Sequence, residues 1–405
     1  MNNRQRFNAT MHYQPRDRAP LLDFGFWDET LIVWHDQGLP ADITDNASAS
    51  RFFCMDFGLD ELINSTGAWA GLAPRFEEGV VEDLGEHVIY QQWDGVRVKR
   101  QKFMRTIPHI VSRMLVDRAS WRAHYKPRLD PANPSRYPDD WDARVQVWRD
   151  PRRDFPICLH AGSLLGWIRN WVGIENLAML LYDDLAWVEE MVETVADCSM
   201  GMLTRVLETG GAFDSCHMWE DICYNAGPLI SPKHFKRLLV PHYRRITDLL
   251  HRHGVDVVWL DCDGKIDQLI PLWLDAGVNC MFPLEIGTWG ADPIRYRQEY
   301  GKDLLMMGGF DKHILARSHH AIAAEVLRLT PLIEEGGFVA FCDHRVPPDV
   351  PYENYVFFVK MAREVWGNNS DLKPQGRLNE PAHALPALVN GMRRNAQARQ
   401  TEWAQ

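Results

Sequence analysis

The sequence predicts an α/β fold, a (β/α)₈ TIM-type barrel with an N-terminal elaboration. From about residue 155 onward, short apolar runs alternate with longer segments of helical periodicity. Strands of a parallel sheet covered by helices read as such continuous apolar runs. Ionisable residues follow most of the runs, as is typical of the carboxyl-terminal mouth of a barrel.

Six apolar runs in the second part of the chain are predicted to be strands. They are residues 155–160, 212–219, 255–261, 278–285, 304–309 and 338–342. Residues 19–25 (APLLDFG) add a seventh strand, and residues 51–58 (RFFCMDFG) are a candidate for the eighth. An open doubly wound sheet is the structural alternative, although no G-x-G-x-x-G follows a strand to indicate dinucleotide binding.

The segments between these runs are predicted to be helices. Residues 184–209 are periodic and end in glycine, as helices often do. Ser231 and Pro232 are typical of an N-cap and a first helical position, and they open a helix over residues 233–254. Residues 266–276, 292–300 and 319–335 follow the same plan.

Residues 1–366 are expected to form a single barrel domain, with residues 26–150 as an elaboration of it. Within that elaboration, VEDLGEHVIYQQWDGVRVKRQ predicts a β-hairpin with Asp94 and Gly95 at its turn. Residues 367–405 are polar, and we expect a C-terminal tail that wraps the surface or is partly disordered.

Composition and charge argue against several classes of protein. The 405 residues include 44 Lys and Arg and 55 Asp and Glu, a formal net charge of −11, so no nucleic-acid partner is expected. The N-terminus lacks the apolar core of a secretory signal, and no run approaches the roughly 18 apolar residues of a membrane span. We expect a cytoplasmic protein with no membrane partner. The eight cysteines form no C-x-x-C and are expected to be buried thiols. The oligomeric state stays open, with a homo-oligomer among the alternatives.

Ionisable groups stand at or just beyond the ends of the predicted strands, which a barrel would bring to one mouth. In chain order, the groups at and just beyond the strand ends are Asp23 and Trp27; His160; His217, Trp219, Glu220 and Asp221; Asp261, Cys262 and Asp263; Glu285; Asp311 and Lys312; Cys342, Asp343 and His344.

Asp261, Asp263 and His344 are the predicted metal ligands. Carboxylates packed this densely raise one another's pKa unless a cation neutralises them. Asp and His both bind zinc, and a catalytic zinc keeps three protein ligands and one open position. The D-x-D spacing just past a strand lets both carboxylates turn toward one point, and His344 approaches from another strand. A divalent metal ion, most simply zinc, is therefore expected.

Each of these residues also has a structural interpretation. Asp263 could cap a helix that begins near Ile266, and Asp261 could accept hydrogen bonds from backbone amides in the turn. His344 could be a buried histidine with its hydrogen bonds satisfied.

The other strand-end groups have structural alternatives of the same kind. Glu220 and Asp221 could cap a loop, and Glu285 could pair with an arginine. Lys312 is more typical of a structural ion pair than of a Schiff-base amine. Cys262 and Cys342 are more often packed thiols than ligands, whereas Trp27 and Trp219 stand where they could line a pocket for an aromatic or cationic substrate.

Other catalytic motifs are absent from the sequence. AGSLLG does not match the G-x-S-x-G of a hydrolase, and there is neither a G-x-x-x-x-G-K-[ST] loop nor an H-E-x-x-H pair.

Several motifs in order resemble one family. WEDICYNAGPLISPKHF, DCDGKIDQLIP, AGVNCMFPLE, YGKDLLMMGGFDK and CDHRVPPDVPYENY resemble the uroporphyrinogen decarboxylase-like superfamily, and FNATMHYQPRDRAPLLDFGFW fits its usual opening. More narrowly, they resemble the branch related to zinc-dependent, corrinoid-associated methyltransferases. The resemblance implies a (β/α)₈ barrel with its site at the carboxyl-terminal mouth.

The resemblance also implies a His-x-Cys pair after one strand and a Cys after the last. Those positions here are Asp261, Asp263 and His344, so oxygen ligands replace thiolates and divalent metals other than zinc also fit.

The function implied is a metal-dependent methyltransferase (demethylase). It would move a methyl group from a small O-, N- or S-methyl substrate to a corrinoid on a separate protein, because the chain has no D-x-H-x-x-G signature of its own. His344 and either Glu220 or Glu285 are the expected catalytic residues, with a glutamate as proton donor to the leaving group. The expected substrate-binding residues are Trp27, His160, His217, Trp219, Asp311 and Lys312.

Two other functions stay open. The first is a metal-dependent decarboxylase or lyase of a small carboxylate in the same fold, since a histidine of the true decarboxylase matches His344. The arginine-rich motif that grips porphyrin propionates is absent, however, and the acidic DFGFWDE stands near its place. The second is a non-catalytic ligand-binding subunit.

Overall fold

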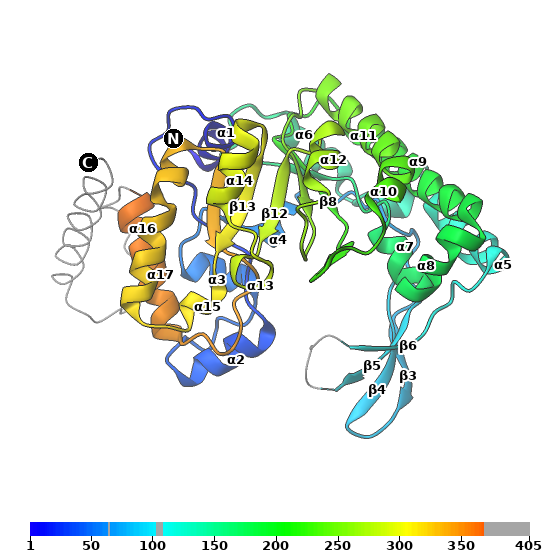
Figure 1. The fold of residues 1–405 in the computed structure, drawn as a ribbon, viewed down its shortest axis with the longest axis horizontal. Coiled ribbons are helices and arrows are strands. Elements are labelled where there is room, and N and C mark those ends of the chain that lie inside the picture. Colours follow the sequence, from blue (N-terminus) through cyan, green and yellow to red (C-terminus); the bar gives the residue numbers. More distant parts are fainter. Residues whose placement is uncertain (64, 103–107, 368–405) are drawn as a thin grey trace.

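A six-stranded parallel sheet forms the centre of the molecule. The structure, a computed structural model, describes residues 1–63, 65–102 and 108–367. The strands lie in the order β14-β13-β12-β11-β8-β7, and helices pack around them (Figure 1). Their bounds are β7 (Cys158–His160), β8 (Ser215–Trp219), β11 (Val258–Asp261), β12 (Cys280–Leu284), β13 (Leu305–Phe310) and β14 (Phe338–Cys342). The expected α/β fold with a parallel sheet is confirmed.

Two further parallel strands, β1 (Leu22–Asp23) and β2 (Phe57–Gly58), pair with each other. The chain beyond β1 runs beside the chain beyond β14, because the Trp27 amide donates to the Val346 carbonyl and the Val346 amide donates to the Gly25 carbonyl. The first strands therefore continue the sheet next to β14.

A side chain just beyond α4, and not a backbone ladder, links the chain that follows β2 to β7. The Cys158 amide donates to Ser65 Oγ at 2.9 Å, and the Ser65 hydroxyl contacts the Cys158 carbonyl at 3.2 Å. Within the described residues, backbone pairing alone does not close the eight parallel strands into a ring. We call this contact the seam.

The helices that follow β7 cover the outside of the sheet. Their bounds are α7 (Gly166–Val172), α8 (Ile174–Asp183), α9 (Leu185–Leu207), α10 (Pro232–Leu238), α11 (Val240–Arg252), α12 (Ile270–Asp275), α13 (Ile286–Trp289), α14 (Pro293–Tyr300), α15 (Lys312–Leu315), α16 (His319–Glu335) and α17 (Tyr352–Trp366). The single helix predicted over residues 233–254 is two helices. The break falls at Leu239, because Pro241 lacks an amide hydrogen and its ring clashes with the preceding turn.

The N-terminal part contributes helices and a separate antiparallel sheet. The helices are α1 (Asn3–Met11), α2 (Asp28–Asp36), α3 (Asn46–Phe52), α4 (Leu59–Ile63), α5 (Arg118–Ser120) and α6 (Trp141–Arg149), with shorter turns at Trp121–Tyr125, Lys126–Leu129, Pro134–Arg136 and, later, Gly301–Asp303. Of the candidate eighth strand at residues 51–58, only Phe57–Gly58 is a strand, because α3 extends to Phe52.

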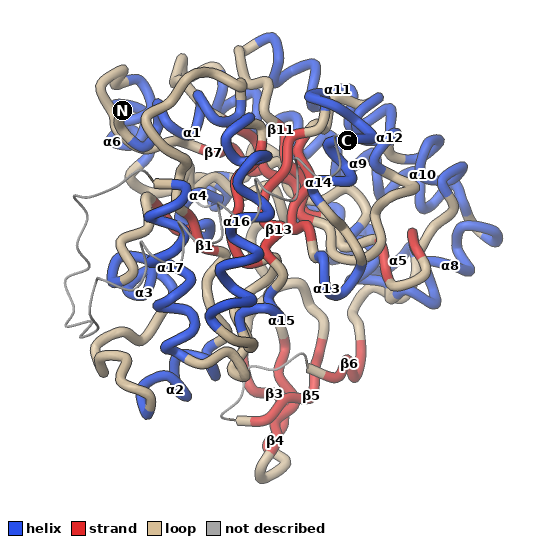
Figure 2. Tube along the Cα trace, turned by 60° about the vertical axis from the view of Figure 1, so that its left-hand side comes forward, coloured by secondary structure: helices blue, strands red, loops and turns tan. Residues whose placement is uncertain are grey.

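The antiparallel sheet projects from the body at the end where α13 and α15 lie (Figures 1 and 2). Its strands are β3 (Gly79–Asp83), β4 (His87–Gln91), β5 (Arg97–Gln101) and β6 (His109–Ser112), and a small pair, β9 (Cys223–Tyr224) and β10 (Gly227–Pro228), lies after β8. Strands β4 and β5 form a hairpin whose turn contains Asp94 and Gly95. The predicted tail lies outside the described residues.

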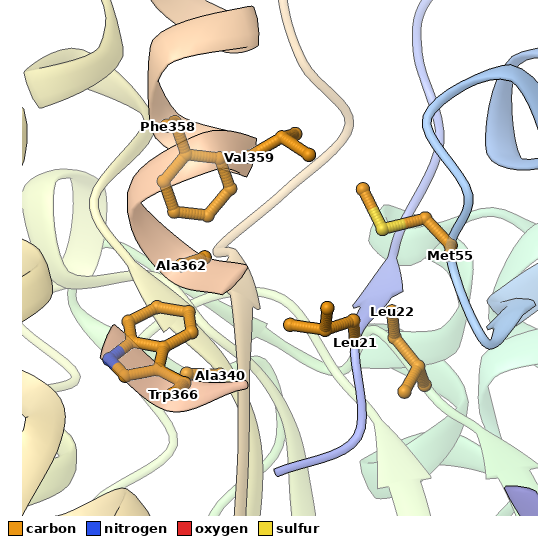
Figure 3. Close-up of a pocket in the computed structure, with 8 residues that line it drawn as sticks. All are labelled: Leu21, Leu22, Met55, Ala340, Phe358, Val359, Ala362 and Trp366. Carbon is orange, nitrogen blue, oxygen red and sulfur yellow. The ribbon is translucent and has the colours of Figure 1, made fainter. Parts of the chain in front are cut away.

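Helix α17 packs over β1 and β14 and encloses a small apolar pocket (Figure 3). Leu21 and Leu22 line it from the first strand, and Phe358, Val359 and Trp366 line it from the helix. Its other lining residues are Met55, Ala340 and Ala362. No ionisable side chain lines this pocket, so it offers packing and no acid–base or metal chemistry.

Within the described part of the chain, no helix is both long enough and apolar enough to cross a membrane.

Candidate metal centre

Three aspartates meet at the carboxyl ends of β8 and β11. Asp221 follows β8, Asp261 is the last residue of β11, and Asp263 comes two residues later. One carboxylate oxygen from each lies within 4.8 Å of the others. Asp221 has a positive φ of 47°, a sharp turn that aspartate tolerates better than most residues, and its Oδ1 accepts the Asp263 amide at 3.0 Å.

The electrostatics of this aspartate cluster favour a bound cation. Burial, together with the charge of Asp263, raises the pKa of Asp221 to about 7. Burial and the neighbouring Asp221 and Asp263 raise the pKa of Asp261 well above its usual value. Among the described residues, no Lys or Arg forms an ion pair with these three carboxylates. Carboxylates that form no ion pair with Lys or Arg suit a divalent metal, which is bound by such oxygen donors.

His344 lies beside the aspartate cluster. Its Nε2 is 3.8 Å from Asp263 Oδ2, and its partly buried ring stacks on Trp27 with centroids 5.7 Å apart and an interplanar angle of 22°. Phe24 contacts the ring from another direction, with centroids 5.3 Å apart. The structure thus brings Asp261, Asp263 and His344 to one place, and their role as ligands stays a prediction.

The structure does not support the cap interpretation of Asp263 or the turn interpretation of Asp261. Helix α12 begins at Ile270 with Leu269 at its N-cap, so Asp263 does not cap it. Among the described residues, no backbone amide donates to the carboxylate of Asp261. Neither carboxylate is therefore used to hold its own turn.

His160 and His217 form a stacked pair next to the cluster. Their Nδ1 atoms are 2.9 Å apart, and their rings are 5.0 Å apart with an interplanar angle of 16°. His217 Nε2 lies 4.0 Å from Asp261 Oδ2 and has no hydrogen-bond partner. Burial lowers the pKa of His160 to about 4 and that of His217 well below its usual value, so both are neutral at pH 7.

Glu220 faces away from the cluster, toward the start of α7. Its carboxylate accepts the amides of Leu164, Leu165 and Gly166 at 2.8–2.9 Å and the hydroxyl of Tyr243 at 2.6 Å. The Ser163 hydroxyl is a fifth donor at 3.2 Å, so this fully buried carboxylate satisfies amides at a helix N-terminus that have no partner within the helix. These contacts give Glu220 a structural role, and its part as proton donor stays a prediction.

Glu285 and Lys312 form a nearly buried ion pair. Lys312 Nζ lies 2.5 Å from Glu285 Oε1 and 3.1 Å from Thr288 Oγ1, and Trp289 Nε1 donates to Glu285 Oε2. The pair is close enough to Asp261 for the charge of Glu285 to raise the pKa of Asp261. The ion-pair interpretation of Lys312 is confirmed, and the partner of Glu285 is this lysine where an arginine had been expected.

Asp311 caps the short helix α15, since its Oδ1 accepts the His313 amide at 2.9 Å. Trp219, at the end of β8, is partly buried, and the guanidinium of Arg169 lies 5.6 Å from the centre of its ring. Cys262 and Cys342 are buried free thiols whose pKa burial raises well above the usual value. The two cysteines are thus packed as expected, while substrate binding by Asp311 and Trp219 stays a prediction.

Sequence reasoning placed Asp221 at the mouth but left it out of the ligand set. The usable signal was its position directly beyond a strand that neighbours β11 in the sheet. Trp69 was not singled out either, although its ring lies 5.9 Å from that of His160 and 4.5 Å from the guanidinium of Arg75. The loop that holds Trp69 carries no pattern that would place it there.

A family model described as uroporphyrinogen decarboxylase (URO-D) matches residues 161–365, which include every residue of the cluster. The chain belongs to the uroporphyrinogen decarboxylase family. The resemblance inferred from the sequence motifs is confirmed at this level.

A solved structure gives an independent comparison for the fold of this family member. It is a methyltransferase from Methanosarcina mazei, with 14% sequence identity and a TM-score of 0.55. The alignment covers 90% of this chain and 99% of that one. At this identity the likeness shows a shared fold. A search of curated proteins finds no match.

Proposed function

We propose that the protein is a metal-dependent methyltransferase. It would take a methyl group from a small O-, N- or S-methyl substrate and pass it to the corrinoid of a separate protein. Membership of the uroporphyrinogen decarboxylase family and a fold shared with a methyltransferase support this proposal.

The observation that carries the proposal is the aspartate cluster with His344 beside it. Asp221, Asp261 and Asp263 converge with no Lys or Arg ion pair to them among the described residues, and His344 Nε2 is 3.8 Å from Asp263 Oδ2. These donors fit a divalent ion such as zinc. When bound, the ion supplies Lewis-acid polarisation of the heteroatom that carries the methyl group.

The chain's own residues would bind the methyl donor and take part in proton transfer to the leaving heteroatom. The indole of Trp27, stacked on His344, offers an apolar face beside the ligands, and Trp219 offers a second one at the end of β8. Such faces hold methyl or methylammonium groups by about 0.5–2 kcal/mol per contact. Glu285 would act in proton transfer to the leaving heteroatom together with Lys312, whose ammonium carries the proton of the ion pair.

Finer features of the fold belong to the same proposal. We place the eight parallel strands in a (β/α)₈ barrel whose ring passes through the seam at Ser65 and Cys158. The corrinoid protein would dock at the mouth near Trp27 and Trp219. We also place the protein in the cytoplasm, where a reduced corrinoid partner would be found.

A decarboxylase or lyase of a small carboxylate is the second candidate, favoured by the family to which the chain belongs. In that case the metal ion would hold the substrate carboxylate. Turnover of uroporphyrinogen itself is not expected, because the mouth is acidic and would repel a polyanionic porphyrin.

The experiment compares methyl donors with and without a corrinoid partner. The zinc-loaded protein is incubated with methyl ethers and methylamines, in the presence and absence of reduced corrinoid protein, and methylcobalamin is followed by absorbance. The proposal expects demethylation only in the corrinoid arm. Equal demethylation in both arms contradicts corrinoid dependence, and decarboxylation of a small acid without demethylation supports the second candidate.

A further inference from the structure

His217 has a buried ring nitrogen that the protein itself does not use. The side chain is 4% exposed, and its Nε2 has no hydrogen-bond partner among the described residues. A buried polar atom left unpaired destabilises a fold, and native proteins contain few of them. We therefore expect His217 Nε2 to bind a group from outside the chain.

The ring is held so that Nε2 points toward the aspartate cluster. Nδ1 is 2.9 Å from His160 Nδ1, and the indole of Trp259 packs against the ring with centroids 4.3 Å apart. Nε2 is 4.0 Å from Asp261 Oδ2, too far for a hydrogen bond. Two donors that share a metal ion with bonds of about 2.0–2.1 Å lie about 3.3–4.2 Å apart, depending on the angle between the bonds.

We propose that His217 binds the metal ion of the cluster through Nε2, and that His160 holds the ring in the tautomer that this requires. Two Nδ1 atoms at 2.9 Å need one proton between them. If His217 donates that proton, its Nε2 carries a free lone pair facing Asp261. His160 then acts as a positioning residue, in the manner of the outer groups that orient metal-binding histidines.

An imidazole changes which ions the cluster selects. Three carboxylates alone are a hard oxygen site, which suits Mg²⁺ or Ca²⁺. With imidazole donors from His217 and His344 the set is mixed, and such sets favour Zn²⁺, Co²⁺ and related ions. The inference rests on the proposed function only for the presence of a metal ion, and no step of methyl transfer enters its test.

The test measures metal binding directly. His217→Asn keeps an amide near the Nδ1 position but removes the group at Nε2, and His253→Asn, an exposed histidine at the end of α11, is the matched control. Zn²⁺ and Mg²⁺ affinities are measured by competition titration, and bound imidazoles are counted by zinc K-edge X-ray absorption. We expect His217→Asn to lose Zn²⁺ affinity about 100-fold or more, to keep its Mg²⁺ affinity within about threefold, and to show one imidazole fewer than the control.

Replacements of His160 separate positioning from structure. His160→Asn retains an acceptor near Nδ1 and should keep nearly full Zn²⁺ affinity. His160→Leu removes the acceptor and should lose Zn²⁺ affinity about 10- to 100-fold, as outer-sphere substitutions do. Equal losses in both variants would contradict the tautomer role of His160.

The outcomes distinguish this inference from the proposed function. An unchanged imidazole count and Zn²⁺ affinity in His217→Asn overturns the inference, whatever the methyl-transfer assay gives, and so does a wild-type protein that binds no Zn²⁺. Loss of an imidazole in a protein that demethylates nothing supports the inference and removes the proposed function. If His217→Asn does not fold, His344→Asn decides, because it must still show one bound imidazole.

Discussion

The aspartates at the two ends of strand β8 have opposite surroundings. Asp214, just before the strand, accepts Arg4 Nε at 2.7 Å and Arg153 Nη2 at 2.6 Å, with its side chain 2% exposed. Asp221, just after the strand, has no ion pair with an arginine or lysine within the described residues, and its neighbours there are two more aspartates. Among the described residues, arginines form ion pairs with Asp214, whereas no Lys or Arg forms an ion pair with the three aspartates of the cluster.

This difference distinguishes a carboxylate with a structural role from a carboxylate that is a candidate ligand. A buried carboxylate with internal arginines is satisfied in the folded protein, and removing a partner harms stability. A carboxylate whose pKa is raised by burial and by like charges is stabilised in its charged form when a cation binds from solution. The same residue type, on the same strand, thus has a structural role at one end and a candidate binding role at the other.

The largest expected effect comes from removing a ligand. Asp261→Ala and His344→Ala should each lower Zn²⁺ affinity at least about 1,000-fold, or about 4 kcal/mol, while the fold survives. Competition titration and metal analysis of the purified variants measure it. Asp267→Ala is the control, because Asp267 lies in the same loop but pairs with Arg295 at 2.6 Å. Full metal content in both ligand variants would show that the ligand assignment is wrong.

Removing the ion pair at Asp214 should lower the stability of the protein and leave metal binding intact. Arg153→Ala strips Asp214 of a buried partner and should lower the free energy of unfolding by about 3–5 kcal/mol. Arg152→Ala, next in the chain with a side chain 87% exposed, should change it by less than about 0.5 kcal/mol. Denaturant unfolding compares the two. Similar values for both variants would contradict the structural role of the amino-end pair.

Bound zinc should stabilise the folded protein through the aspartate cluster, as the arginines do through Asp214. At a free Zn²⁺ concentration 100 times the dissociation constant, the wild-type protein should gain about 2.7 kcal/mol of stability. Asp261→Ala should gain almost none at the same concentration. Thermal and denaturant unfolding with and without chelator measure the gain, and an equal gain in both proteins would place the zinc elsewhere.

The metal-free protein should also show a pH dependence of its stability. Asp221 has a pKa of about 7 in the folded state, raised from 3.8, so the folded state retains a proton that the unfolded state has lost. Stability should therefore fall as the pH rises from about 4 to about 7, by up to about 1.4 kcal/mol per pH unit from this group. Asp221→Asn should remove that part of the slope. Unfolding curves in chelator across this range measure the difference, and parallel slopes would contradict it.

Much of the fold could be predicted from the sequence, because apolar runs report burial directly. The strands that end at Asp261 and Cys342 were placed from their continuous apolar residues, and α16 was predicted with its observed bounds of 319–335. The helix break at Leu239 was not predicted. Pro241 causes it, but the amphipathic pattern continues on both sides of this proline.

The site was harder to predict because its geometry depends on turns and on contacts across the sheet. Asp221 joins the cluster through a positive φ that no sequence pattern announces. Glu220 stands next to Asp221 in the chain, but its longer side chain reaches the start of α7. The closeness of His217 to Asp261 follows from the pairing of β8 with β11, which the order of strands in the sheet decides.

The seam at Ser65 has a consequence for how this architecture can vary. A backbone ladder between two strands imposes a register, so a length change beside it would displace every later pair. A hydroxyl that bonds the amide and carbonyl of one residue, Cys158, imposes no such alignment. The long stretch between Ser65 and Cys158, which includes the projecting antiparallel sheet, begins and ends at this contact. Insertions there can lengthen or shorten while the strand ends that carry Asp221, Asp261 and His344 keep their positions.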